Sequence, residues 1–373
     1  MPIFKYYRPN IYFEKAIRYN ELYFSANHEL NDPNDLKATY YFEDSPELWR
    51  ALLSLGSISA AWNILLHVSR DDEEFIFQLN SLFKGVEIDS LTGSVRETIK
   101  SKETELKDLF ERSIIDTPAR SDSGLSEESS REGRVSLCVL IITELLARAV
   151  NHKFYSVSFS KSALEPMMWA HYADGFKGCV LIYGGLDGPD VKLRRHLMSD
   201  KCEVYPLREV KYIDSDKRIP ILECATKGKT KVEEAFLQKN SFWDYEKELR
   251  IFTIEEIKTH LMAAIDKKSE NPMQRILHHG TNFIAGVIFG PRVDDSYQRF
   301  VETTIASNRQ YADEKNAFFS FNTVLDPHGR LEISTASKVI DQTLGRRIYE
   351  NEEKAKLLLD FGIIKPVSGG QGL

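Results

Sequence analysis

The sequence has few cysteines, and their arrangement is typical of neither a metal site nor a disulfide framework. Its 373 residues contain Cys138, Cys179, Cys202 and Cys224, which lie far apart, form no CxxC pair and have no histidine at metal-ligand spacing. A chain of this length buries a sufficient core without disulfides. We therefore expect four buried thiols in a reducing compartment.

Long hydrophobic runs and an excess of positive charge are also missing. No stretch approaches the roughly 18 apolar residues of a membrane span, and the first residues, MPIFKYYRPN, lack the apolar segment of a signal peptide. The 56 Asp and Glu residues outnumber 49 Lys and Arg residues, which gives a formal net charge of -7. These features predict a cytoplasmic protein with no membrane partner and no free, non-specific binding to nucleic acid.

Two common nucleotide-binding motifs are absent as well. Neither GxGxxG nor GxxxxGK[ST] stands at a strand-to-helix junction, which disfavours Rossmann and P-loop chemistry. The irregular order of strands and helices predicts an α+β fold with a mixed, largely antiparallel sheet. Strand patterns occur at 3–8, 21–26, 154–160, 179–183, 204–212, 249–254, 283–289 and 318–324, and helix patterns at about 166–174, 227–240 and 295–308.

Composition divides the chain into three parts. Residues 1–44 and 153–330 are expected to form one discontinuous α+β core. Residues 45–152 are predicted to be a helical insertion, which contains a Ser/Glu-rich exposed loop at 117–134 and offers a surface for a homo-oligomer or a complex. Residues 331–373 are expected to form a C-terminal helical extension with a flexible tail.

The first candidate site combines two aromatic strands with a turn. Residues 5–8 (KYYR) place a guanidinium beside aromatic rings, and Tyr23 and Ser25 lie in the second strand, shortly before an NDP turn at 31–33. Such strands can simply pack against each other through their rings. In the functional interpretation, Arg8 supplies a fixed fork of donors for a phosphate or a carboxylate.

A stripe of serines precedes a helix that carries an indole and an imidazole. Because side chains alternate along a strand, Ser156, Ser158 and Ser160 share one face. In the helix that follows, Trp169 is either a core residue or a platform for a ligand, and His171 is either structural or catalytic. Three hydroxyls in a row beside a core are unusual, which makes this segment a candidate binding site.

A Glu-x-Glu-x-Arg pattern forms the third candidate. In a strand, Glu246, Glu248 and Arg250 share one face. Two neighbouring carboxylates repel each other, so the pKa of at least one is expected to rise unless Arg250 or Lys247 neutralises it. The pattern fits either a charge ladder on an edge strand or a carboxylate pair in a cleft, where one carboxylate stabilises an oxocarbenium-like centre.

Together these segments resemble the bacterial family filed as domain of unknown function 2971. Its pattern consists of a KYR-like start, an LYFS strand, an NDP turn, an SFS strand, an MWxHYA helix, a WxYExExR segment and a GxxxGP strand, present here at 5–8, 22–25, 31–33, 158–160, 168–173, 243–250 and 286–291. The resemblance spans roughly residues 1–42 and 153–310 and leaves 45–152 without a counterpart. It implies no activity, since the family has none assigned.

The order of an early arginine, a Ser-x-Ser strand and a Glu-x-Glu pair is also similar to the R…STS…ExE arrangement of ADP-ribosyltransferases. On that resemblance, Arg8 would hold a phosphate of NAD, while Ser158 and Ser160 would brace the nicotinamide pocket. Glu248 would bind a ribose hydroxyl and stabilise the oxocarbenium ion. The sequence departs from the family pattern in having Val157 and Phe159 around the serines.

This resemblance implies an enzyme that cleaves NAD and transfers ADP-ribose to a macromolecule or to water, as a bacterial toxin or a phage-defence effector would. The catalytic residues would be Glu248, Glu246 and His171. The NAD-binding residues would be Arg8, Tyr23, Ser25, Ser158, Ser160, Trp169 and Arg250. No residue is assigned to a resident metal under this hypothesis.

Two other classes of function stay open. A nuclease would use Glu246, Glu248, Asp174 and His171 around a divalent metal ion. A non-enzymatic sensor or interaction module would use the aromatic clusters only as core and would dock a partner on residues 45–152. Dependence on NAD or on a divalent metal separates the three classes.

Overall fold

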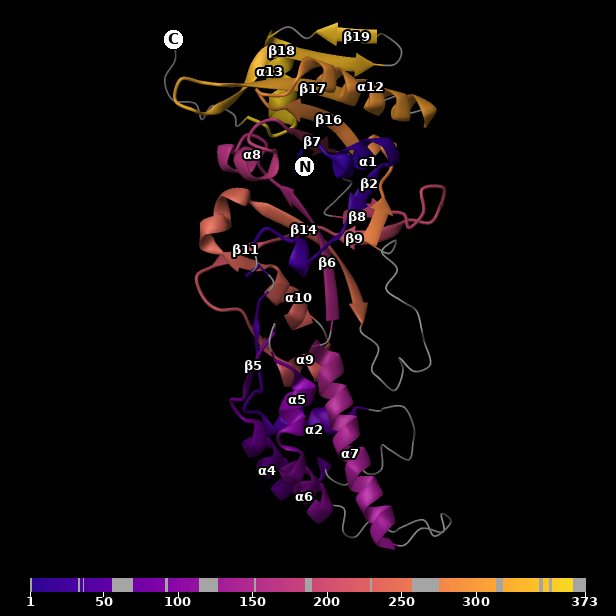
Figure 1. The fold of residues 1–373 in the computed structure, drawn as a ribbon, viewed down its shortest axis with the longest axis vertical. Helices are drawn as coiled ribbons and strands as arrows, with labels where there is room; N and C mark the ends of the chain where they lie inside the picture. The colour runs from indigo at the N-terminus through magenta and orange to yellow at the C-terminus, as the bar shows by residue number, and fades with distance from the viewer. Residues whose placement is uncertain are drawn as a thin grey trace.

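The computed structural model shows an elongated molecule with a large sheet towards one end and a group of helices at the other (Figure 1). The chain begins within the sheet region, enters the helices and returns to the sheet. The structure describes residues 2–32, 34–35, 37–55, 70–90, 93–113, 127–150, 152–184, 190–228, 230–256, 275–312, 318–341, 345–348 and 351–364.

The main sheet has ten strands in the order β10-β14-β6-β1-β7-β16-β17-β18-β19, and β3 also pairs with β6. Every pairing is antiparallel except that of β16 with β17. The prediction of an α+β fold with a mixed, largely antiparallel sheet is confirmed. The strands are β1 (Ile3–Tyr7), β3 (Ser25–Ala26), β6 (His152–Ser160), β7 (Cys179–Tyr183), β10 (Arg208–Glu209), β14 (Glu248–Glu256), β16 (Ile284–Phe289), β17 (Phe318–Leu325), β18 (Leu331–Asp341) and β19 (Gly345–Ile348).

Shorter strands form four small sheets around the main one. They pair β4 (Thr39–Tyr41) with β5 (Glu87–Asp89) and β12 (Arg218–Pro220), β2 (Glu21–Tyr23) with β15 (Ile276–His278), β8 (Asp190–Leu193) with β9 (Glu203–Pro206), and β11 (Lys211–Ile213) with β13 (Gln238–Asn240). The prediction of a single strand at 204–212 is therefore wrong, because three short strands that belong to different sheets occupy these residues. Pro206, which ends the first of them, has no N–H to continue a ladder.

Helices cover both faces of the main sheet. They are α1 (Ile11–Tyr19), α8 (Pro166–Tyr172), α9 (Ile221–Lys227), α10 (Thr230–Phe236), α12 (Asp295–Tyr311) and α13 (Asn351–Asp360), with the 3-10 turns η1 (Asn27–Glu29), η3 (Ser241–Glu246) and η5 (Thr281–Phe283). Helices α1 and α12 share an apolar core with one face, and α8 and α13 pack on the other. The helix predicted at 227–240 is divided instead, because Gly228 ends α9 at a φ of 89° and residues 238–240 form β13.

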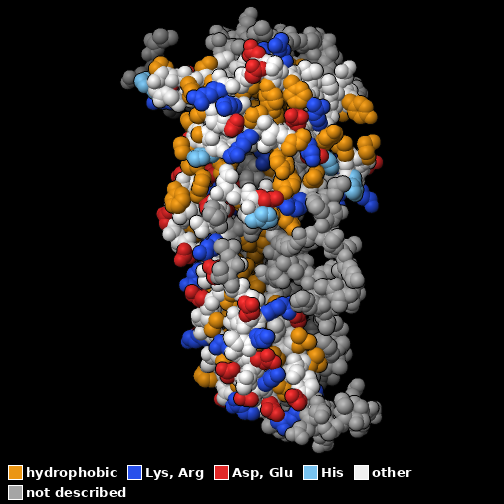
Figure 2. All heavy atoms as spheres, in the orientation of Figure 1, with side chains coloured by type: hydrophobic (Ala, Val, Ile, Leu, Met, Phe, Trp, Pro, Cys, Tyr) orange, Lys and Arg blue, Asp and Glu red, His pale blue; other side chains and the backbone are white. Residues whose placement is uncertain are grey.

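The helical region, which we define as α2 (Pro46–Ser54), α4 (Glu73–Phe83), α5 (Val95–Lys100), α6 (Glu103–Ser113) and α7 (Glu127–Val150), has its own apolar core. Helix α2 begins with Ser45 as N-cap and a proline in the first turn, both favourable at a helix start. Helix α9, from the later part of the chain, adds Ile221 and Leu222 to this core. On the visible face, Lys, Arg, Asp and Glu side chains are interspersed over the helical region, whereas hydrophobic side chains gather over the sheet region (Figure 2).

Several expectations about exposed or terminal segments need correction. Residues 127–134, predicted as part of a loop, begin α7, while residues 117–126 lie outside the described residues. Residues 331–341 form β18 rather than part of a helical extension, because the stretch is rich in β-branched residues and pairs with β17. The predicted flexible tail, 367–373, lies outside the described residues.

The burial of the cysteines and the lengths of the helices can be compared with the expectations from the sequence. Three of the four thiols are buried, but Cys202 is exposed, so the expectation of four buried thiols is wrong for that residue. Of the helices in the described ranges, none combines the length and the apolar character that crossing a bilayer requires.

Candidate functional site

A cavity opens where two neighbouring strands of the main sheet separate. Strand β1 pairs with β7 along its whole length but has only one registered pair with β6, Phe4 with Ser160. Further along β6, Ser156 pairs with Ser25 of β3 instead. The cavity has a volume of about 620 Å³ and lies between these strands and α1. Its size is that of a site for a nucleotide or another small molecule.

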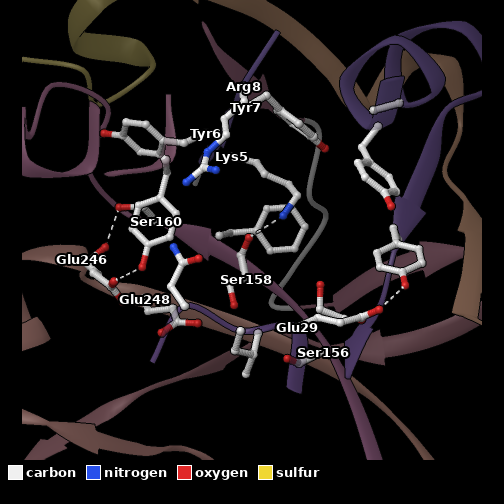
Figure 3. A pocket seen from close by; sticks show the side chains of 18 of the residues that line it. Lys5, Tyr6, Tyr7, Arg8, Glu29, Ser156, Ser158, Ser160, Glu246 and Glu248 are labelled. Carbon is white, nitrogen blue, oxygen red and sulfur yellow. Dashed lines mark hydrogen bonds between the residues drawn. The ribbon is translucent and has the colours of Figure 1, made fainter. Parts of the chain in front are cut away.

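Seven of the ten residues predicted to act at the site line this cavity. They are Glu246, Glu248, Arg8, Tyr23, Ser25, Ser158 and Ser160. Figure 3 shows the two glutamates at one end, the serines of β6 along the floor and Arg8 reaching in from the opposite wall. The strand alternation that placed the three serines on one face is thus matched by their common position in the cavity wall.

Trp169 and His171, which the sequence placed among the candidates, do not line the cavity. Trp169 is fully buried on α8, donates its indole N–H to the Ala163 carbonyl at 2.8 Å and packs edge-on against Tyr6. It is a core residue and offers no face to a ligand. The exposed His171 contributes through its backbone carbonyl, which accepts a hydrogen bond from Arg8 at 2.9 Å. Its ring lies instead near Tyr245.

Arg250 lies behind the cavity wall and holds two carboxylates together. Its side chain is 1% exposed. Its Nε and Nη2 donate to the two Glu248 oxygens at 2.6 and 2.9 Å. Its Nη1 and Nη2 donate to the two Asp35 oxygens at 3.0 and 2.5 Å. A guanidinium with these donors engaged is a structural counter-ion, so the prediction that Arg250 binds the cofactor directly is corrected.

Lys239 of β13 completes a buried set of charges. Its ammonium group lies 2.5 Å from a Glu246 oxygen, 3.4 Å from a Glu248 oxygen and 3.6 Å from an Asp35 oxygen. We call Asp35, Lys239, Glu246, Glu248 and Arg250 the charge network. Each of these residues is at most 4% exposed. Three acids and two bases therefore share one desolvated space, where each charge depends on its neighbours.

The two glutamates reach this network from different elements. Glu248 is the first residue of β14, whereas Glu246 ends η3, and Lys247 between them has a φ of 44° in the left-handed region. The expectation that both glutamates share one strand face is therefore wrong. Glu246 is fixed by the Tyr172 hydroxyl, which donates to its carboxylate at 2.5 Å, and by Ser160, which donates to its backbone carbonyl at 2.6 Å.

The environments of the two glutamates separate their pKa values. Burial raises the pKa of Glu246 to about 7, with the negative charge of Glu248 adding to the effect and Lys239 opposing it. Burial alone would also raise the pKa of Glu248, but Arg250, Lys239 and a hydrogen bond from Ser158 lower it to about 2. One carboxylate is thus ionised at neutral pH while the other titrates there, as in a pair with divided acid and base roles.

Lys5 lies in the gap between β1 and β6. Its ammonium group donates to the Ser158 carbonyl at 3.1 Å. This hydrogen bond gives the β6 carbonyl a partner at a position where β1 has no registered pair with β6. Burial lowers the pKa of Lys5 to about 8, against the attraction of Glu248. Lys5 therefore adds a positive charge to the cavity at neutral pH and stays close to losing it.

The mouth of the cavity is basic and belongs to α1. Arg8 and Lys15, both exposed, line it together with Asn10, the N-cap whose side chain accepts from the backbone N–H groups of Tyr12 and Phe13. A guanidinium, an ammonium group and a helix N-terminus all attract an anion. The binding of a phosphate by Arg8 stays a prediction, and the positive charge at this end is consistent with it.

Several residues of the site were missed by the sequence reasoning. Asp35 and Lys239 were not singled out, although Asp35 closely follows the NDP turn and Lys239 shortly precedes the Glu-x-Glu pattern. The contact of Tyr172 with Glu246 was not predicted either. Proximity in sequence to a recognised motif was the available signal, but it does not specify a contact.

The residues proposed for a metal-dependent nuclease are not gathered into one ligand set. Within the described residues, no three His, Cys, Asp or Glu side chains form a group that could hold a metal ion. Glu246 and Glu248 are paired with Lys239 and Arg250 instead.

The fold and the cavity define the class of this protein, an α+β protein with a small-molecule-sized cavity built around buried charges. Residues 168–251 match the family described as Protein of unknown function (DUF2971), which confirms the resemblance of the motifs to that family over this segment. The matched segment runs from α8 into β14 and includes Glu246, Glu248 and Arg250. No curated protein and no solved structure matches the chain.

Proposed function

We propose that the cavity binds NAD and that the protein cleaves its N-glycosidic bond, transferring ADP-ribose to a macromolecular target or to water. The observation that carries the proposal is the convergence of Arg8, Ser158, Glu246 and Glu248 on one cavity. These residues are separated by up to 240 positions in the sequence, and the resemblance to ADP-ribosyltransferases requires them to meet.

The charge network supplies the electrostatics for the bond-breaking step. When the bond between C1′ and nicotinamide breaks, nicotinamide leaves with the electron pair and positive charge develops on the ribose. Glu248, which has a pKa of about 2, is a fixed negative charge at the cavity wall. A preorganised charge of this kind stabilises the transition state more than the ground state, because it needs no reorganisation.

Glu246 is suited to accept a proton in the same reaction. Its pKa of about 7 lets it stand as a free base in a large fraction of molecules at neutral pH. As the hydroxyl of water or of a target bonds to C1′, its proton passes to Glu246. Tyr172 and Lys239 hold the carboxylate in place for this transfer.

The mouth of the cavity fits the other half of the substrate. Arg8 keeps one guanidinium contact with the His171 carbonyl, which orients the remaining donors towards a pyrophosphate. Lys15 and the N-terminus of α1 add positive potential beside it. The local basic residues thereby overcome the net charge of -7 of the whole chain.

The test of this proposal is release of nicotinamide from NAD by the purified chain and by Glu248→Gln. The substitution keeps the shape of the side chain but removes its charge, so turnover is expected to fall at least 100-fold. Circular dichroism and thermal melting check that the variant folds. Glu21→Gln is the matched control, because Glu21 lines the cavity outside the charge network.

A second variant covers the case in which Glu248→Gln fails to fold. Arg8 is exposed, so Arg8→Ala should fold normally while its KM for NAD rises roughly tenfold through loss of a phosphate contact. If the wild-type chain releases no nicotinamide with any acceptor, or if Glu248→Gln turns over NAD as fast as the wild type, the proposed reaction is refuted.

A further inference from the structure

The end of the cavity farthest from the glutamates has a different chemistry. It is formed by Tyr12 of α1, Tyr23 of β2, Ser25 of β3 and Ser156 of β6, which we call the hydroxyl end. In Figure 3, Ser156 lies at the opposite side of the cavity from Glu246, with Ser158 between them. The hydroxyl end contains no member of the charge network, and the proposed bond cleavage does not use it.

Ser156 carries a hydroxyl group whose hydrogen-bonding capacity is unused. The residue is 5% exposed, and its Oγ has no hydrogen-bond partner among the residues that the structure describes. Ser158 and Ser160, on the same face of β6, bond to Glu248 and to the Glu246 carbonyl. Because a buried unsatisfied hydroxyl is unfavourable, its place in a cavity wall points to a partner that arrives with a ligand.

Two tyrosine rings beside it provide a flat surface. The rings of Tyr12 and Tyr23 lie 5.6 Å apart, and Tyr12 is 58% exposed. Tyr23 is held firmly, because its hydroxyl donates to Glu29 at 2.8 Å and the Arg275 guanidinium lies 4.7 Å from its ring centre. An exposed ring next to a fixed one is an arrangement on which a planar group can stack.

We propose that the hydroxyl end binds the purine ring of an adenine nucleotide, stacked on Tyr12 and hydrogen-bonded by Ser156. A purine has a large π face and a polar edge that can both donate and accept, which matches a tyrosine ring beside a free hydroxyl. The basic residues Arg8 and Lys15 line the cavity as well and suit the attached phosphates. The identity of the whole ligand as NAD rests on the proposed function, but purine binding does not.

The test uses adenosine monophosphate as the probe, in equilibrium titration with the full chain. The wild type should bind it, and Tyr12→Ala should weaken binding about tenfold through loss of stacking. Tyr19→Ala is the matched control, because Tyr19 is an exposed ring on the same helix that does not line the cavity. Equal affinity of these two variants would overturn the assignment, as would the absence of binding to the wild type.

Ser156→Ala separates a binding role from a structural one. If the hydroxyl serves the ligand, the variant should bind adenosine monophosphate several-fold more weakly and have an unchanged or higher melting temperature without ligand, since an unsatisfied buried group is removed. A lower melting temperature with unchanged affinity would contradict the proposal.

The same experiments distinguish failure of this inference from failure of the proposed function. Glu248→Gln should bind adenosine monophosphate like the wild type, because Glu248 lies in the charge network at the other end. Binding that depends on Tyr12 without any cleavage of NAD would refute the reaction and retain the purine site. Cleavage of NAD with the same KM in Tyr12→Ala and Tyr19→Ala would retain the reaction and refute the purine site.

Discussion

The helical region and the cavity of the sheet region bury very different side chains. Among the described residues of the helical region, the buried side chains are apolar apart from Asn80. All of these apolar side chains except Ala149 join into one core, with rings such as Trp49 and Phe110. The sheet region instead buries the five charged residues of the charge network beside the cavity. The helical region therefore has the apolar interior of a stable core, whereas the interior beside the cavity is charged.

The difference indicates that the buried charges beside the cavity serve a purpose other than stability. Burying ions brings a desolvation penalty that ion pairing offsets only in part, so apolar residues of similar size are often as stable or more so. A network of five buried charges beside a cavity is therefore poorly explained by folding alone. The proposed function accounts for it, because that chemistry needs Glu248 ionised and a pKa near 7 for Glu246.

The largest expected effect is that of removing Arg250. Arg250→Met fills a similar volume but leaves Asp35 and Glu248 buried without their main counter-ion. We expect the free energy of unfolding to fall by about 3–5 kcal/mol, measured by urea denaturation.

A core substitution in the helical region is the matched control for that experiment. Leu52→Met conserves volume in an apolar environment and should lower the free energy of unfolding by less than about 1.5 kcal/mol. If Arg250→Met were as stable as Leu52→Met, the charge network would not be a coupled unit, and the contrast between the regions would disappear.

A smaller effect is expected in the dependence of stability on pH. Because burial raises the pKa of Glu246 from 4.5 to about 7, its contribution to stability is fully present below pH 4.5 and is lost as the pH rises through 7. Glu246→Gln should remove this loss. The free-energy difference between the wild type and the variant should therefore shift in favour of the variant as the pH increases from 4.5 to 7.

The comparison must be made against the variant, because another group titrates in the same window. Burial lowers the pKa of His279 from 6.5 to about 4, so its effect on the wild type has the opposite sign between those values. The effect of His279 is common to both proteins and cancels in the difference. A pH-independent difference would show that Glu246 does not have a raised pKa in the folded state.

Local patterns in the sequence were sufficient for much of the sheet and for one wall of the cavity. Alternation along β6 placed Ser156, Ser158 and Ser160 on one face, and all three line the cavity. Such an alternation depends on neighbours within a few residues. The family pattern, which spreads over the chain, was confirmed for 168–251.

The charge network could not be deduced in the same way. Arg250 meets Asp35 across 215 positions, and this contact depends on the register of β14 and on the turn that contains Asp35. The orientation of Trp169 could not be predicted from the sequence either, since the helix pattern of α8 does not specify which neighbour its indole packs against. Periodicity gives the face of an element but not the partner of that face.

The smallest effect tests whether the two regions are independent. Ile142 is fully buried on α7 within the core of the helical region, so Ile142→Val should lower the free energy of unfolding by about 1 kcal/mol. Turnover of NAD and affinity for adenosine monophosphate should be unchanged, because none of the described residues of the helical region lines the cavity. A change in either quantity would mean that the helical core is coupled to the charge network and regulates it, so that stability and chemistry are not divided between the two regions.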